Sequence, residues 1–149
     1  MAVQTSAGIK LSISSSLPAT NDESGFDALA DFDLIGEVES IDAFGITYNN
    51  VEFTALDNRR VRKFKGSYDP GTPGITLAID RSDAGQTTAK AALDSDSDYS
   101  FKIEYQDGSI DYYVGKVMSF TTNPGGVDNI VMGNMTIGIN DDPVEVAAT

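Results

Sequence analysis

The sequence of 149 residues contains no cysteine, no histidine and no tryptophan. Without cysteine the chain has neither a disulfide framework nor a thiolate metal site, which fits a reducing compartment. Without histidine it lacks the commonest general base and metal ligand. These absences argue against an enzyme, and the sequence predicts no catalytic residue, no metal site and no cofactor.

Long apolar runs are missing as well. No stretch approaches the roughly 18 consecutive apolar residues that a membrane-spanning helix needs. The first residues, MAVQTSAGIKLSISSS, lack the basic start and the long apolar core of a signal peptide. We therefore expect a soluble protein without membrane insertion. The length favours a single domain over residues 1–149.

Basic residues are few and unevenly placed. The chain has 23 acidic residues against 10 basic ones, a formal net charge of -13, and no Lys or Arg lies between Leu11 and Asn58. By composition alone, the simplest interpretation is that the acidic loops maintain solubility and that one loop is basic by chance. Segregated charges of opposite sign also favour head-to-tail contacts between copies, which give rings or filaments. Half of the bases form one cluster around Phe64: Arg59, Arg60, Arg62, Lys63 and Lys65.

Apolar residues recur mainly with a period of two, which is typical of half-buried β-strands. The alternation is clear in GIKLSIS, GITLAID and YSFKIEYQ, and VMGNMTIGIN adds a small polar second face. The pair Asp107-Gly108 predicts a tight type I′ hairpin. Gly115, inside the strand that follows, suggests a bulge or bend.

One segment, residues 83–95, predicts a short helix that is capped by Ser82 or Asp83 and carries a short apolar stripe of Ala89, Ala92 and Leu93. Residues 1–33 are expected to form an N-terminal arm or strand and an acidic loop, and residues 57–72 a long basic loop. Residues 141–149 are expected to form a flexible C-terminal tail. The predicted fold class is mainly β: an antiparallel β-sandwich or partial barrel with one short α-helix and two long loops.

Carboxylate chemistry is the remaining enzymatic alternative. The run Asp94–Asp98 spaces acids like the start of a calcium loop, but Tyr99 and Tyr105 stand where that loop needs Gly and Glu. A solvated turn explains the run better. Glycoside hydrolysis needs two carboxyl groups in a cleft, usually beside aromatic platforms for the sugar. The missing tryptophan makes that function a poor match.

The basic cluster is the best candidate for a nucleic-acid contact, since Phe64 and Tyr68 supply stacking rings among the charges. Against this, the net negative charge of the domain repels phosphate that comes within a Debye length of about 8 Å. We therefore expect the cluster to contact a protein surface, such as an acidic surface on another copy of the chain. The candidate acidic counter-surface consists of Asp22, Glu23, Asp27, Asp31, Asp33, Glu37, Glu39 and Asp42.

The order of segments from Leu34 to Asp141 resembles the major tail tube proteins of long-tailed bacteriophages, especially the lambda-like siphophage branch. The segments are LIGEVESIDAFG, VEFTAL, a long polar loop, PGTPGITLAIDRSDAGQTTAKAAL, YSFKIEYQDGSIDYYVGKVMSF and NIVMGNMTIGIND. The resemblance implies a tube domain without the extra C-terminal immunoglobulin-like domain of some members. It leaves open whether the tube belongs to a siphophage, a contractile tail or a gene transfer agent.

The resemblance implies a non-enzymatic structural subunit of the virion tail, assembled in the host cytoplasm. Hexameric rings would stack into a hollow conduit, with tape measure, tail terminator and tail tip proteins as further partners. Residues Arg59–Lys65 would clamp the next copy. DNA would pass without specific binding through a negative bore, lined in part by faces such as Asn134, Thr136 and Gly138. The alternative is a β-sandwich binding module, an adhesin or a carbohydrate-binding domain.

Overall fold

A computed structural model describes residues 3–147 of the chain. The predicted mainly β fold class is confirmed, because the described residues form ten strands and two helices. The elements follow one another as β1 (Lys10–Ser14), α1 (Glu23–Asp27), β2 (Asp33–Ile35), β3 (Val38–Ile41), β4 (Thr47–Thr54), β5 (Val61–Asp69), β6 (Gly74–Ala78), α2 (Ala84–Leu93), β7 (Tyr99–Glu104), β8 (Ile110–Asn123), β9 (Met132–Ile139) and β10 (Val144–Val146).

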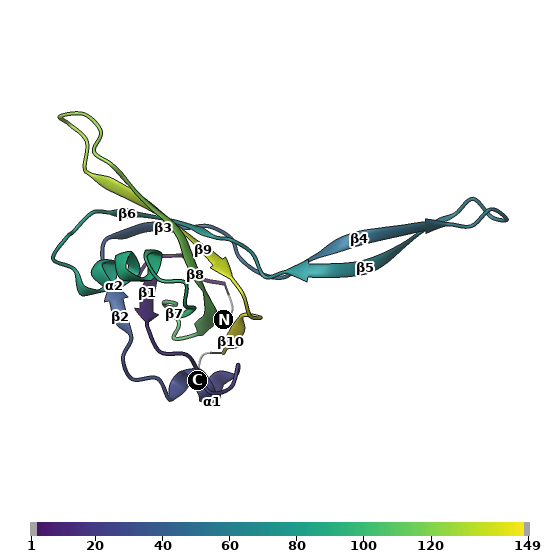
Figure 1. Cartoon of the computed structure of the whole chain (residues 1–149), viewed down its shortest axis with the longest axis horizontal. Coiled ribbons are helices and arrows are strands. Elements are labelled where there is room, and N and C mark those ends of the chain that lie inside the picture. Colours follow the sequence, from purple (N-terminus) through teal and green to yellow (C-terminus); the bar gives the residue numbers. More distant parts are fainter. Residues whose placement is uncertain (1–2, 148–149) are drawn as a thin grey trace.

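Eight strands form one antiparallel sheet in the order β2-β1-β7-β8-β9-β6-β3, with β10 paired to β8 beside this path. The long strand β8 pairs first with β7 and then with β9, and a register shift follows Val117. Gly115 lies where the two pairings meet, and a Cβ there would come within 2.4 Å of the carbonyl oxygen of Gly138. This close approach lets the sheet curl around its core as a partial barrel (Figure 1).

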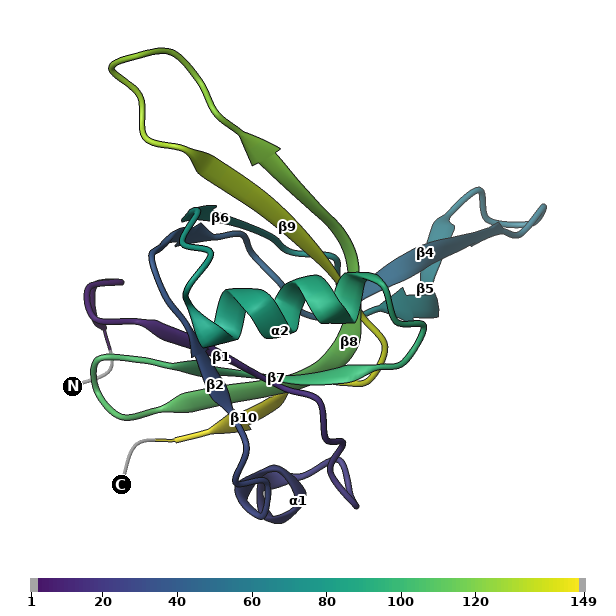
Figure 2. The same ribbon diagram turned by 60° about the vertical axis from the view of Figure 1, so that its left-hand side comes forward.

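The core lies on the concave side of the sheet, under helix α2 (Figure 2). Inward-facing residues of the predicted alternating strands, such as Leu11, Ile75 and Phe101, are buried. Helix α2 lies within the segment predicted to be helical, and Asp83 caps it by accepting from the backbone N–H of Gln86. The buried Gln86 side chain donates to the carbonyl oxygens of Gly36 and Ala78, which ties the helix to the β2–β3 connection and to β6.

The acidic N-terminal segment is not a loop throughout. Asp22 accepts a hydrogen bond from the Gly25 N–H and begins the five-residue helix α1, which the sequence analysis missed. Phe26 of this helix is buried and stacks on Tyr112, with ring centroids 4.8 Å apart. A second, smaller cluster thus forms around Phe26, Tyr112 and Val114.

The segment predicted as a long basic loop, residues 57–72, consists largely of strand β5. It pairs with β4 in a two-stranded sheet of its own, and this hairpin projects from the body as an arm (Figure 1). The loop prediction was wrong because β5 lacks the alternation of apolar residues that indicates a half-buried strand. Its apolar residues Val61 and Phe64 lie on opposite faces. The predicted C-terminal tail is also partly wrong: Val144–Val146 pair with β8, while residues 148 and 149 lie outside the described part.

The β7–β8 hairpin is present, but its turn is not the predicted type I′. Within the described residues the left-handed φ of this loop occurs at Gly108 and not at Asp107. The Gly108 N–H donates to the Tyr105 carbonyl, and the Tyr105 N–H donates to the Ser109 carbonyl. These bonds close a three-residue loop, the other common arrangement that uses glycine in a left-handed conformation.

Candidate functional site

One face of the β4–β5 arm is apolar. The strand register places Val51 opposite Phe64 and Phe53 opposite Arg62. Because alternate residues of a strand share a face, these four side chains lie on the same side of the hairpin. The Arg62 guanidinium lies 5.2 Å from the centroid of the Phe53 ring, so a cation–π contact continues the apolar surface.

The other face of the arm is basic. Lys63 lies opposite Glu52, and Lys65 lies opposite Asn50. The Lys65 ammonium is 4.7 Å from the centroid of the Tyr48 ring, and this ring contacts Tyr68 across the strands at a centroid distance of 5.2 Å. The arm therefore presents cations along its length and two tyrosines at its root.

The tip of the arm carries the remaining bases and one leucine. Arg59 adopts a left-handed φ of 58°, and its N–H donates to the Ala55 carbonyl oxygen. The Asn58 side chain then accepts from the Arg60 N–H, which completes the turn. Leu56 is fully exposed at this tip. The turn thus holds an apolar side chain and two arginines at the far end of the molecule.

The arm has no core of its own. Every residue of β4 is exposed, and so is every residue of β5 except Gly66. An isolated two-stranded hairpin is marginally stable at best in water, and monomeric proteins rarely leave a large apolar patch uncovered. The exposed large apolar residues of the arm are Tyr48, Val51, Phe53, Leu56, Val61, Phe64 and Tyr68.

The structure brings together all six residues of the predicted contact loop, Arg59, Arg60, Arg62, Lys63, Phe64 and Lys65. None of these bases forms an ion pair with the described residues 3–147, where the ion pairs are Lys102–Glu104 and Lys116–Asp98. Their charges are therefore available to a partner.

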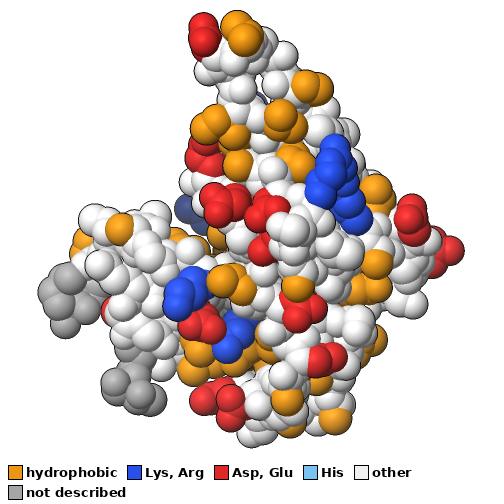
Figure 3. All heavy atoms as spheres, turned by 90° about the vertical axis from the view of Figure 1, so that its left-hand side faces the viewer, with side chains coloured by type: hydrophobic (Ala, Val, Ile, Leu, Met, Phe, Trp, Pro, Cys, Tyr) orange, Lys and Arg blue, Asp and Glu red, His pale blue; other side chains and the backbone are white. Residues whose placement is uncertain are grey.

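The eight acidic residues of the predicted counter-surface are exposed but do not form one patch. Asp22, Glu23 and Asp27 belong to α1 and its cap, whereas Glu39 lies on β3 and Asp42 follows it. These elements lie at opposite ends of the body in Figure 1, and acidic side chains occur in separate groups on the face shown in Figure 3. The remaining three are Asp31, Asp33 and Glu37, along the chain between α1 and β3.

Several of these acids have local structural roles. The Gly25 N–H and then the Thr20 hydroxyl lower the pKa of Asp22. The hydroxyls of Ser14 and Ser16 lower the pKa of Asp31 in the same way. These two carboxylates already accept hydrogen bonds within the chain, so they are less available to a partner than acids without such bonds.

The outward face of the sheet at β6 and β9 is polar and uncharged. Asn134 and Thr136, on β9, lie opposite Thr76 and Gly74 of β6. The Thr76 hydroxyl donates to the Asn134 side-chain oxygen at 3.1 Å. The same face continues onto β8, where Lys116 lies opposite Gly138 and forms an ion pair with Asp98. Neither helix of the described chain has the length and apolar character to cross a membrane.

No protein-family model matches the chain, and no curated protein matches its sequence. Solved structures do share its fold. The SPP1 tail tube protein is 14% identical with a TM-score of 0.65, over 93% of this chain and 76% of that one. A chain from the tail of a gene transfer agent particle is 11% identical with a TM-score of 0.69, over 97% and 100% of the two chains.

A chain of the sheath–tube complex of PVC, an extracellular contractile injection system, is 10% identical with a TM-score of 0.62, over 94% of this chain and 88% of that one. At such identities the likeness establishes a shared fold. The tail-tube fold expected from the sequence is therefore confirmed. Because the matches include phage, gene transfer agent and contractile systems, the fold does not separate these three.

Proposed function

We propose that the protein is the structural subunit of a tail tube, a non-enzymatic chain that assembles into hexameric rings stacked as a hollow conduit. The observation that carries the proposal is the β4–β5 arm, an exposed hairpin with an apolar face and five bases that form no ion pair with residues 3–147. An arm of this kind is suited to bind a neighbouring copy, and the fold is shared with tube proteins.

The arm favours an assembly that propagates. Its surface differs from the rest of the acidic body, so an arm of one copy and a body of another make a heterologous contact. Such contacts close into rings or continue as helical stacks. Assembly also covers exposed strand edges, which otherwise expose unpaired backbone groups. The arm thus supplies both the affinity and the direction of growth.

The charge distribution suits a channel for DNA. Five of the ten bases are on the arm, and the formal net charge of the chain is -13. Lys and Arg facing a lumen would bind phosphates and release counterions, whereas neutral or acidic walls leave the polymer free to slide. The neutral side chains of Asn134 and Thr136 would fit such a wall, and the one lysine beside them, Lys116, is already paired with Asp98. We place the protein in a virion tail, with assembly in the host cytoplasm.

Other tail components would cap and fill the tube: a tape measure protein, a terminator and tip proteins. A second candidate function is a binding module for glycans or another ligand. The paired rings of Tyr48 and Tyr68 at the arm root favour it, since exposed aromatic side chains bind sugars and peptides.

Negative-stain electron microscopy of the purified protein at rising concentration, with light scattering of the same samples, separates the two functions. Hollow tubes or stacked rings of uniform width are the expected result. A protein that stays monomeric at every concentration, also after addition of preformed tail tips, and that binds glycans through Tyr48 and Tyr68 would support the binding module instead.

A further inference from the structure

A groove runs along strand β3, where the curled sheet stays open. Three adjoining hollows form it, and neighbouring hollows share lining residues such as Ser6, Ile9 and Ile41. In two of the hollows one side is the chain that precedes β1, and the other is β3 with the residues that follow it. The third hollow lies between Gln4, the β7–β8 hairpin and β10. The central hollow has a volume of about 340 Å³.

The groove combines apolar walls with acidic groups. Ile9, Ile41 and Phe44 supply the apolar part. The carboxylates of Glu39, Asp42, Asp111 and Glu145 line the hollows, and no Lys or Arg is among the lining residues. Two of these acids, Glu39 and Asp42, belong to the counter-surface that the sequence predicted.

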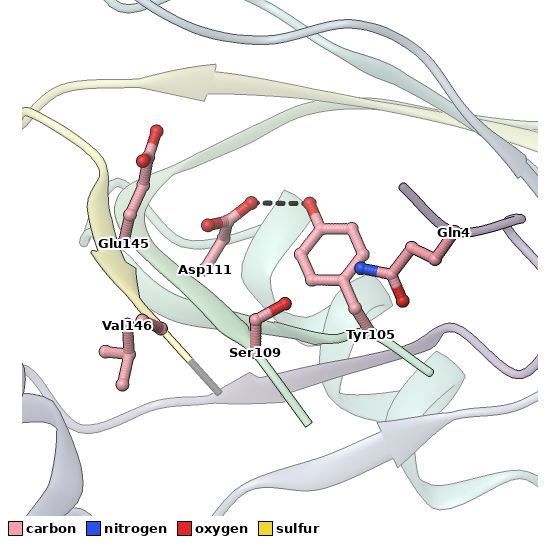
Figure 4. Close-up of a pocket in the computed structure, with 7 residues that line it drawn as sticks. Gln4, Tyr105, Ser109, Asp111, Glu145 and Val146 are labelled. Atoms are coloured by element: carbon pink, nitrogen blue, oxygen red, sulfur yellow. Dashed lines mark hydrogen bonds between the residues drawn. The ribbon is translucent and has the colours of Figure 1, made fainter. Parts of the chain in front are cut away.

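The negative charge at one end of the groove is poorly compensated. Asp111 of β8 and Glu145 of β10 lie at directly opposite positions of paired strands, and both carboxylates line the hollow of Figure 4. The Tyr105 hydroxyl donates to Asp111 at 2.5 Å. Even so, burial and the charge of Glu145 raise the pKa of Asp111. A cation placed here would relieve this repulsion.

A polar group without a partner lies beneath the wall of the groove. The Tyr113 ring packs under Phe44, with ring centroids 5.3 Å apart. Within the described residues its buried hydroxyl has no hydrogen-bond partner. Burial raises the pKa of this hydroxyl, and the nearby residues Tyr105 and Asp111 line the groove. Buried polar groups are otherwise satisfied almost everywhere in native proteins, so the Tyr113 hydroxyl is an exception at the base of the groove.

We propose that this groove is the receptor for the β4–β5 arm of a second copy of the chain. The arm is apolar and basic where the groove is apolar and acidic, so both components of the contact match. The arm of the same chain leaves the body after Phe44, which lines the central hollow, and extends away from the groove (Figure 1). The occupant must therefore come from another molecule.

Backbone pairing can add to this contact. Strand β3 ends the path of the main sheet and pairs with β6 along one edge. A free edge beside a groove is the setting in which an extended segment adds to a sheet, with pockets for alternate side chains. This inference rests on the proposed function, because it names the surface that the tube-forming arm recognises.

Reciprocal charge reversal tests the pairing. Arg59→Glu with Arg60→Glu is expected to abolish sedimentable assemblies, and adding Glu39→Lys with Asp42→Lys in the same chain is expected to restore them. The matched control adds Asp94→Lys with Asp96→Lys, which changes the net charge equally at the exposed turn after α2. If the control pair restores assembly as well as Glu39→Lys with Asp42→Lys does, the effect depends on net charge alone. That result would overturn the groove assignment.

A second measurement covers the case in which the reversed groove fails to fold. Because the chain has no cysteine, Leu56→Cys and Ser40→Cys can be introduced together without competing thiols. Oxidation of assembled protein should give a ladder of covalent oligomers, whereas Leu56→Cys with the distant Ser97→Cys should not. Assemblies that form without the 56–40 ladder overturn the groove alone. A chain that never assembles overturns the tube function, and the groove with it.

Discussion

Val51 lies directly opposite Phe64 on the arm, and about half of each side chain stays exposed, 51% and 53% respectively. Phe101 and Tyr113 are also opposite each other, on β7 and β8, but both are fully buried. The two cross-strand pairs are alike in chemistry and differ in burial. The buried pair stabilises the fold, whereas the exposed pair can gain its hydrophobic free energy only when a partner covers it.

The first prediction separates these two roles. Phe53→Ser with Phe64→Ser should leave the unfolding free energy of the monomer within about 0.5 kcal/mol per site, as surface substitutions usually do. The same protein should fail to form tubes in negative-stain micrographs. Phe101→Ala is the contrasting variant, with an expected loss of about 3–5 kcal/mol. Tubes of normal width from the arm variant would contradict the assignment of its apolar face.

The second prediction concerns the charges of the arm. Reversal of Arg59, Arg60 and Arg62 to Glu should preserve the circular dichroism spectrum and the melting temperature, because none of the three forms an ion pair in the described chain. Assembly, followed by light scattering, should be lost. Wild-type assembly should also weaken as salt rises, since screening shortens the reach of exposed charges.

The control for this charge reversal is the same change at Lys10, Arg81 and Lys90, which are outside the arm. If both triple variants lose assembly equally, total charge and not the arm is responsible. If the arm variant still assembles, the bases do not clamp a neighbour.

The sequence predicts the main sheet well and the arm poorly, for a physical reason. Strands such as β6 and β7 bury one face, so apolar residues such as Ile75, Leu77 and Phe101 recur at every second position. This alternation can be recognised in the sequence. The arm has no core, and β5 carries no such period. Its bases were found by their charge alone. The groove brings Glu39, Asp111 and Glu145 together from three strands, and no local pattern records that contact.

The third prediction tests how helix α2 is seated. Gly85 packs against β2 so closely that a Cβ would lie 2.2 Å from the Leu34 carbonyl oxygen. Gly85→Ala should therefore destabilise the protein by about 1–3 kcal/mol, the usual cost of overpacking, although alanine favours helices. Gly126→Ala is the matched control, because the nearest atom to its Cβ would be 3.7 Å away. Equal melting temperatures for the two variants would refute the close contact.

The fourth prediction concerns pH and the acidic end of the groove. Burial and the charge of Glu145 raise the pKa of Asp111 in the folded protein, although the Tyr105 hydroxyl acts in the opposite direction. The folded state therefore holds this proton more tightly than the unfolded state. The contribution of Asp111 to the free energy of unfolding is fully present below the unfolded pKa of about 3.9. It is lost as the pH rises through the higher pKa of the folded state.

Asp111→Asn keeps an oxygen to accept from Tyr105 and removes the charge that faces Glu145. At pH 7 it should stabilise the monomer by about 0.2–1 kcal/mol, the usual size of a like-charge pair across strands. The gain should disappear below about pH 3.5, where wild-type Asp111 is protonated. Thermal unfolding of Asp111→Asn and wild type across this pH range measures the difference in stability between the two proteins. Acids that titrate alike in both proteins do not contribute to this difference.

Asp107→Asn should show the opposite sign. Hydrogen bonds from the Ser109 hydroxyl and N–H lower the pKa of Asp107, so its ionised form stabilises the fold at neutral pH and less on acidification. Loss of stability in Asp107→Asn at pH 7, together with gain in Asp111→Asn, would locate the repulsion at the groove. An Asp111→Asn protein no more stable than wild type at pH 7 would mean that Asp111 and Glu145 do not repel each other there. Arginines of a neighbouring arm would then gain no additional stabilisation there from relieving such a repulsion.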